Sequence, residues 1–485
     1  MRPGRARRIA LVALAALAML LLGAAFAAWM LLRPGPQQFR TAADRFAYGS
    51  TGGEALGIPY PVFMVLPRVF PDLVARYARE GYGPAKAGFG GWGAFGLAWE
   101  QGERLPAGFS IERVGYDRVT VNCALCHTAT WRPSAEADRQ IAPGGPGHAV
   151  NLQGMLRFMV AAAHDRRFTA ARLLPEILLN FPLSWAEAKL YAWLLIPATR
   201  AGLRFAGGQL AWMEDRPPWA PGRDDAFNLP KFILTQTPWD NSTGNTDFPA
   251  LWRLGERDGM LLHASGEAHD VYTVAATSAL GTGALPLPGF RARNEWLVAF
   301  LRDLPAPPFP EPVDAALAEA GRAIFVAQCA ACHARGGART GTAIPLDEIG
   351  TDPERARTWT AADAARMNRL TGLLGMEDAR LQAAQGYVAR PLTGLWLLAP
   401  YLHNGSVPTL RDLLLPPAQR PRIFWRGYDV LDRANVGFLA TGPEAEAEGF
   451  RFDTGLRGNG NGGHLYGTAL DGADREALLA YLKTL

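Results

Sequence analysis

Cysteine is scarce in this chain, which has four among its 485 residues. They fall into two Cys-x-x-Cys pairs more than 200 residues apart, and none is left over. A zinc ribbon would need its second pair about 15 to 20 residues after the first, and a thioredoxin-like site would need a βαβ surround. Neither pattern is present. The sequence also lacks a phosphate-binding loop and a nucleophile elbow.

Excess charge of one sign is missing from the body of the chain. Of the 49 lysines and arginines, four lie within the first eight residues, and the other 45 match the 45 acidic residues in number. A balanced body argues against nucleic acid as a partner.

Each cysteine pair is followed directly by a histidine. The two copies of this motif consist of Cys123, Cys126 and His127, and of Cys329, Cys332 and His333. Thioether attachment of haem explains all three residue types, because two thiols bind the porphyrin and the histidine ligates the iron. The sequence therefore predicts a protein with two covalently bound haem c groups, with His127 and His333 as iron ligands.

One long hydrophobic run is present, from Ile9 to Leu32, and it follows the four N-terminal arginines. Its 24 residues exceed the roughly 20 needed to span a bilayer and the about 7 to 15 of a signal-peptide core. We expect residues 1–38 to form a cytoplasmic tip and an inner-membrane anchor, with the body in the periplasm. Secretion to the periplasm after signal cleavage is the alternative.

The remaining chain reads as two unequal domains. Residues 304–314, LPAPPFPEPVD, contain five prolines and predict a stiff, extended linker. It separates an N-terminal haem domain, 39–303, from a C-terminal cytochrome c domain, 315–485. We expect a mainly α fold with two cytochrome c-like haem domains, the first enlarged by long loops.

Apolar spacing predicts the helices of both domains. In the second domain a helix over 316–329 should enter the haem motif, and Asp474 is a possible N-cap for a terminal helix. In the first domain the patterns cover 152–163, 170–179 and 184–205. The last stretch is apolar enough to suggest a second membrane span, but its charged residues and Pro197 favour a buried or surface-docked helix.

Four further segments carry a family resemblance. They are PPWAPGRDDAFN at 217–228, TDFPALW at 246–252, RPLTGLWLLAPYLHNGSVPTLRDLL at 390–414 and GNGNGGHLYGT at 458–468. Together with the haem motifs they resemble the rubber-oxygenase-like branch of bacterial dihaem cytochrome c peroxidases, over most of residues 50–485. The resemblance implies one haem for catalysis or oxygen binding and another for electron transfer.

The second haem needs a distal ligand if it transfers electrons. The resemblance favours His464, which lies shortly before the terminal helix where related peroxidases carry that ligand. Met376 and His403 are the alternatives. His403, in PYLHNGS, also matches an element that packs at the haem edge and can donate to a propionate.

At the first haem the histidines are less decisive, and we expect an open or weakly held sixth site. His148 lies near the position of a removable ligand in the relatives, and it could instead hold a propionate or cap the following helix. His263 and His269 flank a polar loop that the resemblance places near the distal face. Each can also be an ordinary solvated or capping histidine, and His164 is the plainest case.

Two further groups are candidates for supporting roles. Arg223, Asp224 and Asn228 can fix their loop or pair with a propionate. Trp219 and Trp239 lie in family-like loops and can bridge the haems, although a tryptophan more often serves packing.

Two functions remain open. In the first, the protein is an oxidoreductase in which haem one activates peroxide or dioxygen and haem two transfers electrons. In the second, it is a membrane-tethered electron carrier with no substrate chemistry of its own. Expected partners are a redox protein or a quinol-linked electron chain, with a small-molecule oxidant or an organic substrate.

Overall fold

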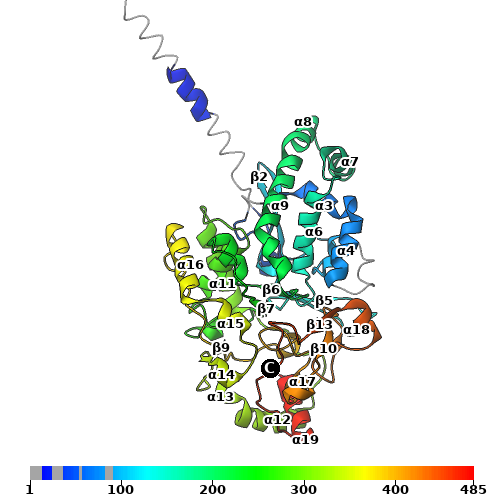
Figure 1. Cartoon of the computed structure of the whole chain (residues 1–485), viewed down its shortest axis with the longest axis vertical. Helices are drawn as coiled ribbons and strands as arrows, with labels where there is room; N and C mark the ends of the chain where they lie inside the picture. Colours follow the sequence, from blue (N-terminus) through cyan, green and yellow to red (C-terminus); the bar gives the residue numbers. More distant parts are fainter. Residues whose placement is uncertain (1–13, 24–36, 54–56, 82–90) are drawn as a thin grey trace, which may run out of the picture.

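The computed structural model describes residues 14–23, 37–53, 57–81 and 91–485. Within these ranges the fold is mainly helical, as the sequence predicts, and the strands form small antiparallel sheets. Figure 1 shows the helices of the N-terminal half at one end of the molecule and those of the C-terminal half towards the other.

The expected anchor, Ile9 to Leu32, lies largely outside the described residues. The part that is described, 14–23, is helical with exposed side chains. No helix in the described ranges is long and apolar enough to span a bilayer.

The helices of the N-terminal half follow the apolar patterns of the sequence. The stretches 152–163 and 170–179 correspond to α6 (Leu152–His164) and α7 (Ala170–Asn180). The stretch 184–205 forms one continuous helix on the surface. It consists of α8 (Trp185–Leu190), a π-helical turn (Tyr191–Leu195) and α9 (Ile196–Leu210).

These helices share an apolar core with α3 (Tyr60–Val69) and α4 (Pro71–Gly81). Aromatic side chains fill its centre. Phe63 stacks on Trp92 with ring centroids 4.0 Å apart, and Phe158 meets the same indole edge-on at 5.5 Å. The core supports the loops that carry the first haem motif, because Leu125 and Val150 belong to it.

A β-hairpin that sequence analysis missed leads into the first haem motif. β2 (Phe109–Val114) and β3 (Tyr116–Val121) pair antiparallel around Gly115, whose φ of 76° favours glycine, and β1 (Ile58–Pro59) pairs with β3. The strands escaped prediction because six residues give too short an alternation to identify.

The C-terminal half is built on two packed helices, α12 (Ala315–Gln328) and α19 (Gly472–Leu482). They cross so closely at Gly321 that a Cβ there would lie 1.9 Å from the carbonyl oxygen of Ala477. The expected N-cap Asp474 is wrong. Asp471 caps α19 by accepting a hydrogen bond from the Asp474 amide at 2.9 Å, because the helix begins three residues earlier than its apolar spacing indicates.

Residues on both sides of the 304–314 linker share one apolar cluster. Ala129 and Trp252 from the first half pack in it with Phe325, Trp396 and Leu478 from the second. The linker itself has no helix or strand, and Pro307 accepts a hydrogen bond from the Trp396 indole at 3.0 Å. Apolar packing therefore continues across the linker, and the proposed domain boundaries stay a prediction.

Candidate haem sites

The first haem motif lies on a 3-10 turn, Cys123–Leu125, directly after β3. Asn122 fixes this turn, since its side-chain oxygen accepts from the Ala124 amide at 2.9 Å and its amide donates to the carbonyl of Gly49 at 2.9 Å. The first motif is therefore held in a fixed turn at the end of the strand.

A single hydrogen bond orients His127. Its Nδ1 lies 2.8 Å from the carbonyl oxygen of Pro249, which leaves Nε2 available to bind a metal. Burial, with a smaller contribution from His263, lowers the pKa of His127 to about 4 against the opposing effect of the hydrogen bond to Pro249. The imidazole is therefore neutral at physiological pH, as a metal ligand must be.

A Gly/Pro loop closes over this motif. The Gly144 amide donates to the carbonyl of His127 and the Gly147 amide to that of Cys126, each at 2.8 Å. A Cβ at Gly147 would lie 2.9 Å from the Cys126 carbonyl oxygen, so glycine allows the loop to come this close.

The second haem motif begins where α12 ends. Cys329 lies between α12 and the short helix α13 (Ala330–His333), and the His333 amide donates to the carbonyl of Cys329 at 2.9 Å. His333 is oriented as His127 is, because its Nδ1 lies 2.8 Å from a backbone carbonyl, that of Arg390.

The structure brings the ring of His464 close to that of His333, with the two planes inclined by 43°. Their ring centroids are 6.2 Å apart. An imidazole–metal bond of about 2 Å on each side, together with the two half-rings, spans about 6 Å. The separation therefore fits one iron between the two histidines.

The loop that carries His464 is rigidly held despite its glycines. The His464 amide donates to the carbonyl of Ile349 at 2.8 Å. The guanidinium of Arg420 donates to the carbonyls of Asn461, Gly463 and His464. His464 itself has a left-handed φ of 47°, so this loop orients the ring at some conformational cost.

The alternative ligands of the second haem occupy other environments. His403 stacks on Tyr387, with ring centroids 3.8 Å apart and planes inclined by 16°. Met376 is buried in an apolar cluster with Met367 and Trp359.

The remaining histidines are spread over different surroundings. His148 is buried with its ring 4.0 Å from that of Phe438, and it does not cap α6, because Asn151 accepts the hydrogen bond from the Gly154 amide. His263 lies near His127 and has a left-handed φ of 61°.

His269 and His164 are both exposed. His269 Nε2 lies 2.7 Å from Oε1 of Gln382, and His164 is the last residue of α6. The structure thus brings one of the three haem-one candidates, His263, towards the proximal ligand His127, and leaves His148 and His269 in separate environments.

Buried cations with unused donors lie beside His403. Arg223 is fully buried and donates from Nη1 to Asn459 at 2.9 Å, but its Nε and Nη2 have no partner in the described part of the chain. Arg355 donates to Ser265 and to Glu267, and its Nε is likewise unpaired among these residues.

The electrostatics of this cluster follow from burial. Burial lowers the pKa of Arg223 to about 9 and holds that of His403 well below its usual range, with the charges of Arg355 and Arg223 contributing to the second shift. Buried guanidinium groups need anionic partners, and haem propionates are carboxylates of the right kind. The donor set therefore fits haem. Arg355 was missed from sequence because its role depends on contacts distant in the chain.

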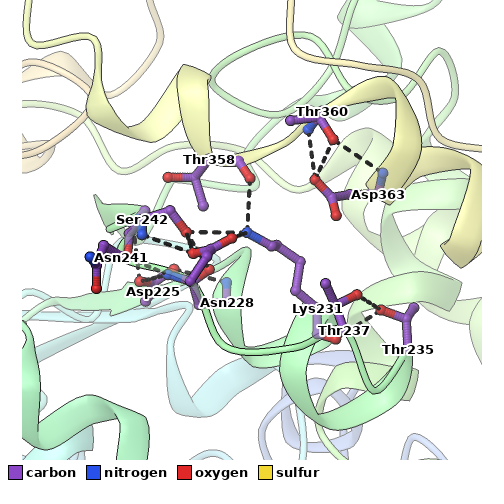
Figure 2. A network of polar contacts seen from close by, with 12 residues as sticks. Asp225, Asn228, Lys231, Thr235, Thr237, Asn241, Ser242, Thr358, Thr360 and Asp363 are labelled. Carbon is purple, nitrogen blue, oxygen red and sulfur yellow. Dashed lines mark hydrogen bonds and ion pairs between the residues drawn. The ribbon is translucent and has the colours of Figure 1, made fainter.

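A polar network fixes the loop that presents Arg223 and Asp224. These residues belong to β6 (Arg223–Asp225), which pairs with β7 (Asn245–Asp247). The buried Lys231 ammonium donates to Asp240 at 2.8 Å, to Ser242 at 3.1 Å and to the Thr358 carbonyl at 3.3 Å. Figure 2 shows Lys231 between Ser242 and Thr358.

Asn228 and Asp225 extend the same network. The Asn228 side chain donates to Asp225 at 2.8 Å and to the Ser242 carbonyl at 2.9 Å, so this residue fixes the loop. Burial raises the pKa of Asp224 to about 7, with Asp225 as a further cause and with Arg355 and Arg223 opposing the shift.

The tryptophans expected between the haems lie elsewhere. Trp219 is buried in a cluster with Trp212 and Phe232, and Trp239 is 54% exposed. Trp252 is an indole that touches both halves. Its ring borders Gly144 and Gly145 of the first-motif loop and Gly394, four residues after Arg390. Its position in TDFPALW was a signal that sequence analysis could have used.

Two family models match parts of the second half of the chain. Residues 386–426 match the family described as RoxA-like, cytochrome c-like. Residues 316–388, which include the second haem motif, match cytochrome C oxidase, cbb3-type, subunit III.

Two relatives come from Sinorhizobium fredii (strain NBRC 101917 / NGR234). The uncharacterized protein y4iM is 34% identical over 224 residues, which are 40% of this chain and 49% of that protein. The uncharacterized protein y4iJ is 44% identical over 114 residues, or 22% of this chain and 19% of that protein. The chain spans less than half the length of these relatives. The matches support a cytochrome c-like family, whose domains imply covalently bound haem c.

Proposed function

We propose that this protein is a dihaem c-type oxidoreductase of the rubber-oxygenase-like branch. In it, Cys123 and Cys126 attach haem one and His127 ligates its iron. Cys329 and Cys332 attach haem two, whose iron lies between His333 and His464. Covalent haem supplies a redox-active iron at each site.

The contrast between the rings beside the two proximal histidines carries the proposal. The ring of His333 lies 6.2 Å from a second imidazole, that of His464, whereas in the described ranges the ring contact of His127 is with Phe248 at 6.4 Å and not with another histidine. Two imidazoles keep the geometry of an iron nearly constant during electron transfer, so His333 and His464 suit a carrier haem. His127 suits a haem at which peroxide or dioxygen is activated.

The buried charges have roles in the same scheme. Arg223 and Arg355 hold haem propionates through their unpaired donors, and His403 donates to a propionate from Nε2. His263 is the candidate for a polar group at the haem-one pocket. His148 and His269 act there only after a rearrangement, because the structure places them in other contacts.

The proposed location is the periplasmic face of the inner membrane, with the segment 9–32 as anchor. Electrons arrive from a redox protein or a quinol-linked chain, and a small oxidant or an organic molecule is the substrate class.

Spectroscopy of the purified holoprotein tests the proposal. A pyridine haemochrome assay should give two haems per chain, and paramagnetic resonance should show one low-spin and one high-spin ferric iron. One haem per chain would contradict the dihaem assignment. Two low-spin irons that bind neither cyanide nor peroxide, in either oxidation state, would leave the electron carrier as the function.

A further inference from the structure

Helices α7, α8 and α9 expose an unusual amount of apolar surface. Leu179, Trp185 and Trp193 are 80%, 78% and 79% exposed. The complete set, called the apolar face below, is Leu178, Leu179, Trp185, Leu190, Trp193, Leu194 and Phe205. Solitary exposed hydrophobic residues are ordinary, but seven within 28 residues of one helical hairpin form a patch that marks an interaction site.

The helix from 185 to 210 is apolar on two opposite sides. Tyr191, Leu195 and Ile196 are buried against the N-terminal core, so the packing of this helix on the body is already complete. Trp193 and Leu194, on the other side, face outward. A surface helix normally carries polar residues at such positions, so the outer side requires its own apolar partner.

The point where the chain enters the body identifies this partner. The side chain of Gln37 donates to the carbonyl of Ile111 in β2 at 2.9 Å. Ile111 and Tyr116 of the same hairpin pack against the apolar cluster that contains Tyr191, Leu195 and Ile196 of the helix from 185 to 210.

The length of chain before Gln37 places a bilayer near the apolar face. The predicted anchor ends at Leu32, and five residues extend over at most about 18 Å. Any membrane that holds the anchor therefore lies within a short reach of the hairpin that packs against the same apolar cluster as the helix from 185 to 210.

The composition of the α7–α9 region fits the boundary between headgroups and acyl chains. Between residues 170 and 210 there are four cations, Arg172, Lys189, Arg200 and Arg204, against two carboxylates. Cations suit anionic phospholipids, and tryptophan prefers the membrane interface. Lys189 lies over the Trp185 ring at 5.8 Å, so one headgroup-seeking charge and one interfacial ring are adjacent.

We propose that the apolar face lies in the outer boundary of the bilayer that holds the N-terminal anchor. The body then rests on the membrane through α7–α9 in a fixed orientation. This binding is interfacial, since no helix of the described ranges is long and apolar enough to cross.

A quenching experiment on the full-length holoprotein tests this. The variant Trp193→Cys is labelled with a small environment-sensitive fluorophore and placed in bilayers of phosphatidylcholine and phosphatidylglycerol, with ordinary or brominated acyl chains. In the proposed function the native cysteines are bonded to haem, so they should not react with the label. If the protein without the Trp193→Cys substitution is labelled, the haem-attachment assignment is wrong, and this outcome is distinct from a failure of the membrane proposal. We expect bromine to reduce emission at residue 193 by about twofold or more.

The matched control is Leu373→Cys at the end of α16 (Ala361–Leu373), where the native side chain is 86% exposed. Its emission should be the same in both lipids. Equal emission at residue 193 in both lipids would overturn the proposal. If the label is unquenched and each bilayer disc contains two chains, the proposal is also wrong, because a second copy of the protein would then cover the apolar face. Intact mass shows whether residues 9–32 are retained. The proposal would also be overturned if a form without residues 9–32 does not float with the lipid vesicles and its label at residue 193 is not quenched.

Discussion

The two haem motifs of this protein share a proximal design and differ in almost everything around it. In both, Nδ1 of the histidine lies 2.8 Å from a backbone carbonyl, and the histidine amide donates to the first cysteine, at 3.0 Å for His127 and 2.9 Å for His333. The first motif follows a strand and is covered by a Gly/Pro loop. The second follows a helix and faces a histidine.

This difference shows which part of a haem site a short motif can specify. Cys-x-x-Cys-His determines the attachment and the proximal ligand from five consecutive residues. The opposite face depends on segments far away in the chain, as the 458–468 loop with His464 does at the second site. The same motif can therefore serve a reactive site and a carrier site.

Removing the imidazole of His464 should have the largest effect on the difference between the two haem sites. In His464→Gly the left-handed φ of 47° suits glycine, so the loop keeps its course while the ligand is lost. We expect the low-spin signal of haem two to disappear and imidazole added from solution to restore it, in optical and paramagnetic resonance spectra. His403→Gly is the control and should leave that signal unchanged. The reverse pattern would assign the ligand to His403.

The packing of α12 against α19, which supports the second site, can be weakened selectively. Gly321→Ala places a Cβ against the Ala477 carbonyl and should lower the free energy of unfolding by about 1 to 3 kcal/mol. The control, Gly372→Ala, lies in a helix with no heavy atom within 4 Å of the added Cβ, and should stabilise by about 0.5 to 1 kcal/mol. Denaturant unfolding followed at the haem absorbance measures both. Equal effects would show that α12 and α19 do not pack as closely as in the structure.

The buried arginines should affect the two haems unequally. A buried positive charge such as that of Arg223 favours ferrous iron. Its removal in Arg223→Met should therefore lower the potential of haem one by tens of millivolts, on the order of 50 mV. Haem one is expected to respond because Asp224, the next residue, acts electrostatically on Cys126. Spectroelectrochemical titration resolves the two potentials.

Arg422→Met is the matched control, because its side chain is 80% exposed and its charge is screened by solvent. It should leave both potentials unchanged. A larger shift at haem two in Arg223→Met would assign the buried cluster to the second site instead.

Sequence alone predicted what is local. The helices over 152–163 and 170–179 have clear 3.6-residue periodicity and are confirmed as α6 and α7. The hairpin β2–β3 was missed because its strands are short. Arg355 and Trp252 were missed because their places depend on partners far away in the chain, such as Glu267 for Arg355 and Gly394 for Trp252. Periodicity contains no information about such contacts.

The last expected effect concerns the charge balance near the first site at different pH values. The pKa of Asp224 is about 7 in the folded chain, above its usual value of 3.8. Between about pH 4 and 7 the unfolded chain has lost this proton while the folded chain retains it. Stability therefore falls as pH rises through this window, by at most about 1.4 kcal/mol per pH unit.

Asp224→Asn should flatten this slope in unfolding experiments between pH 4.5 and about 7. Asp165→Asn is the opposite case, because hydrogen bonding to Arg167 lowers the Asp165 pKa to about 2. Asp165 contributes stability above about pH 4 that is lost between about pH 4 and 2, so its replacement should leave the slope between pH 4.5 and 7 unchanged. If both variants keep the original slope, the Asp224 carboxyl is ionised in the folded protein, and Arg223 and Arg355 neutralise it in place of a propionate.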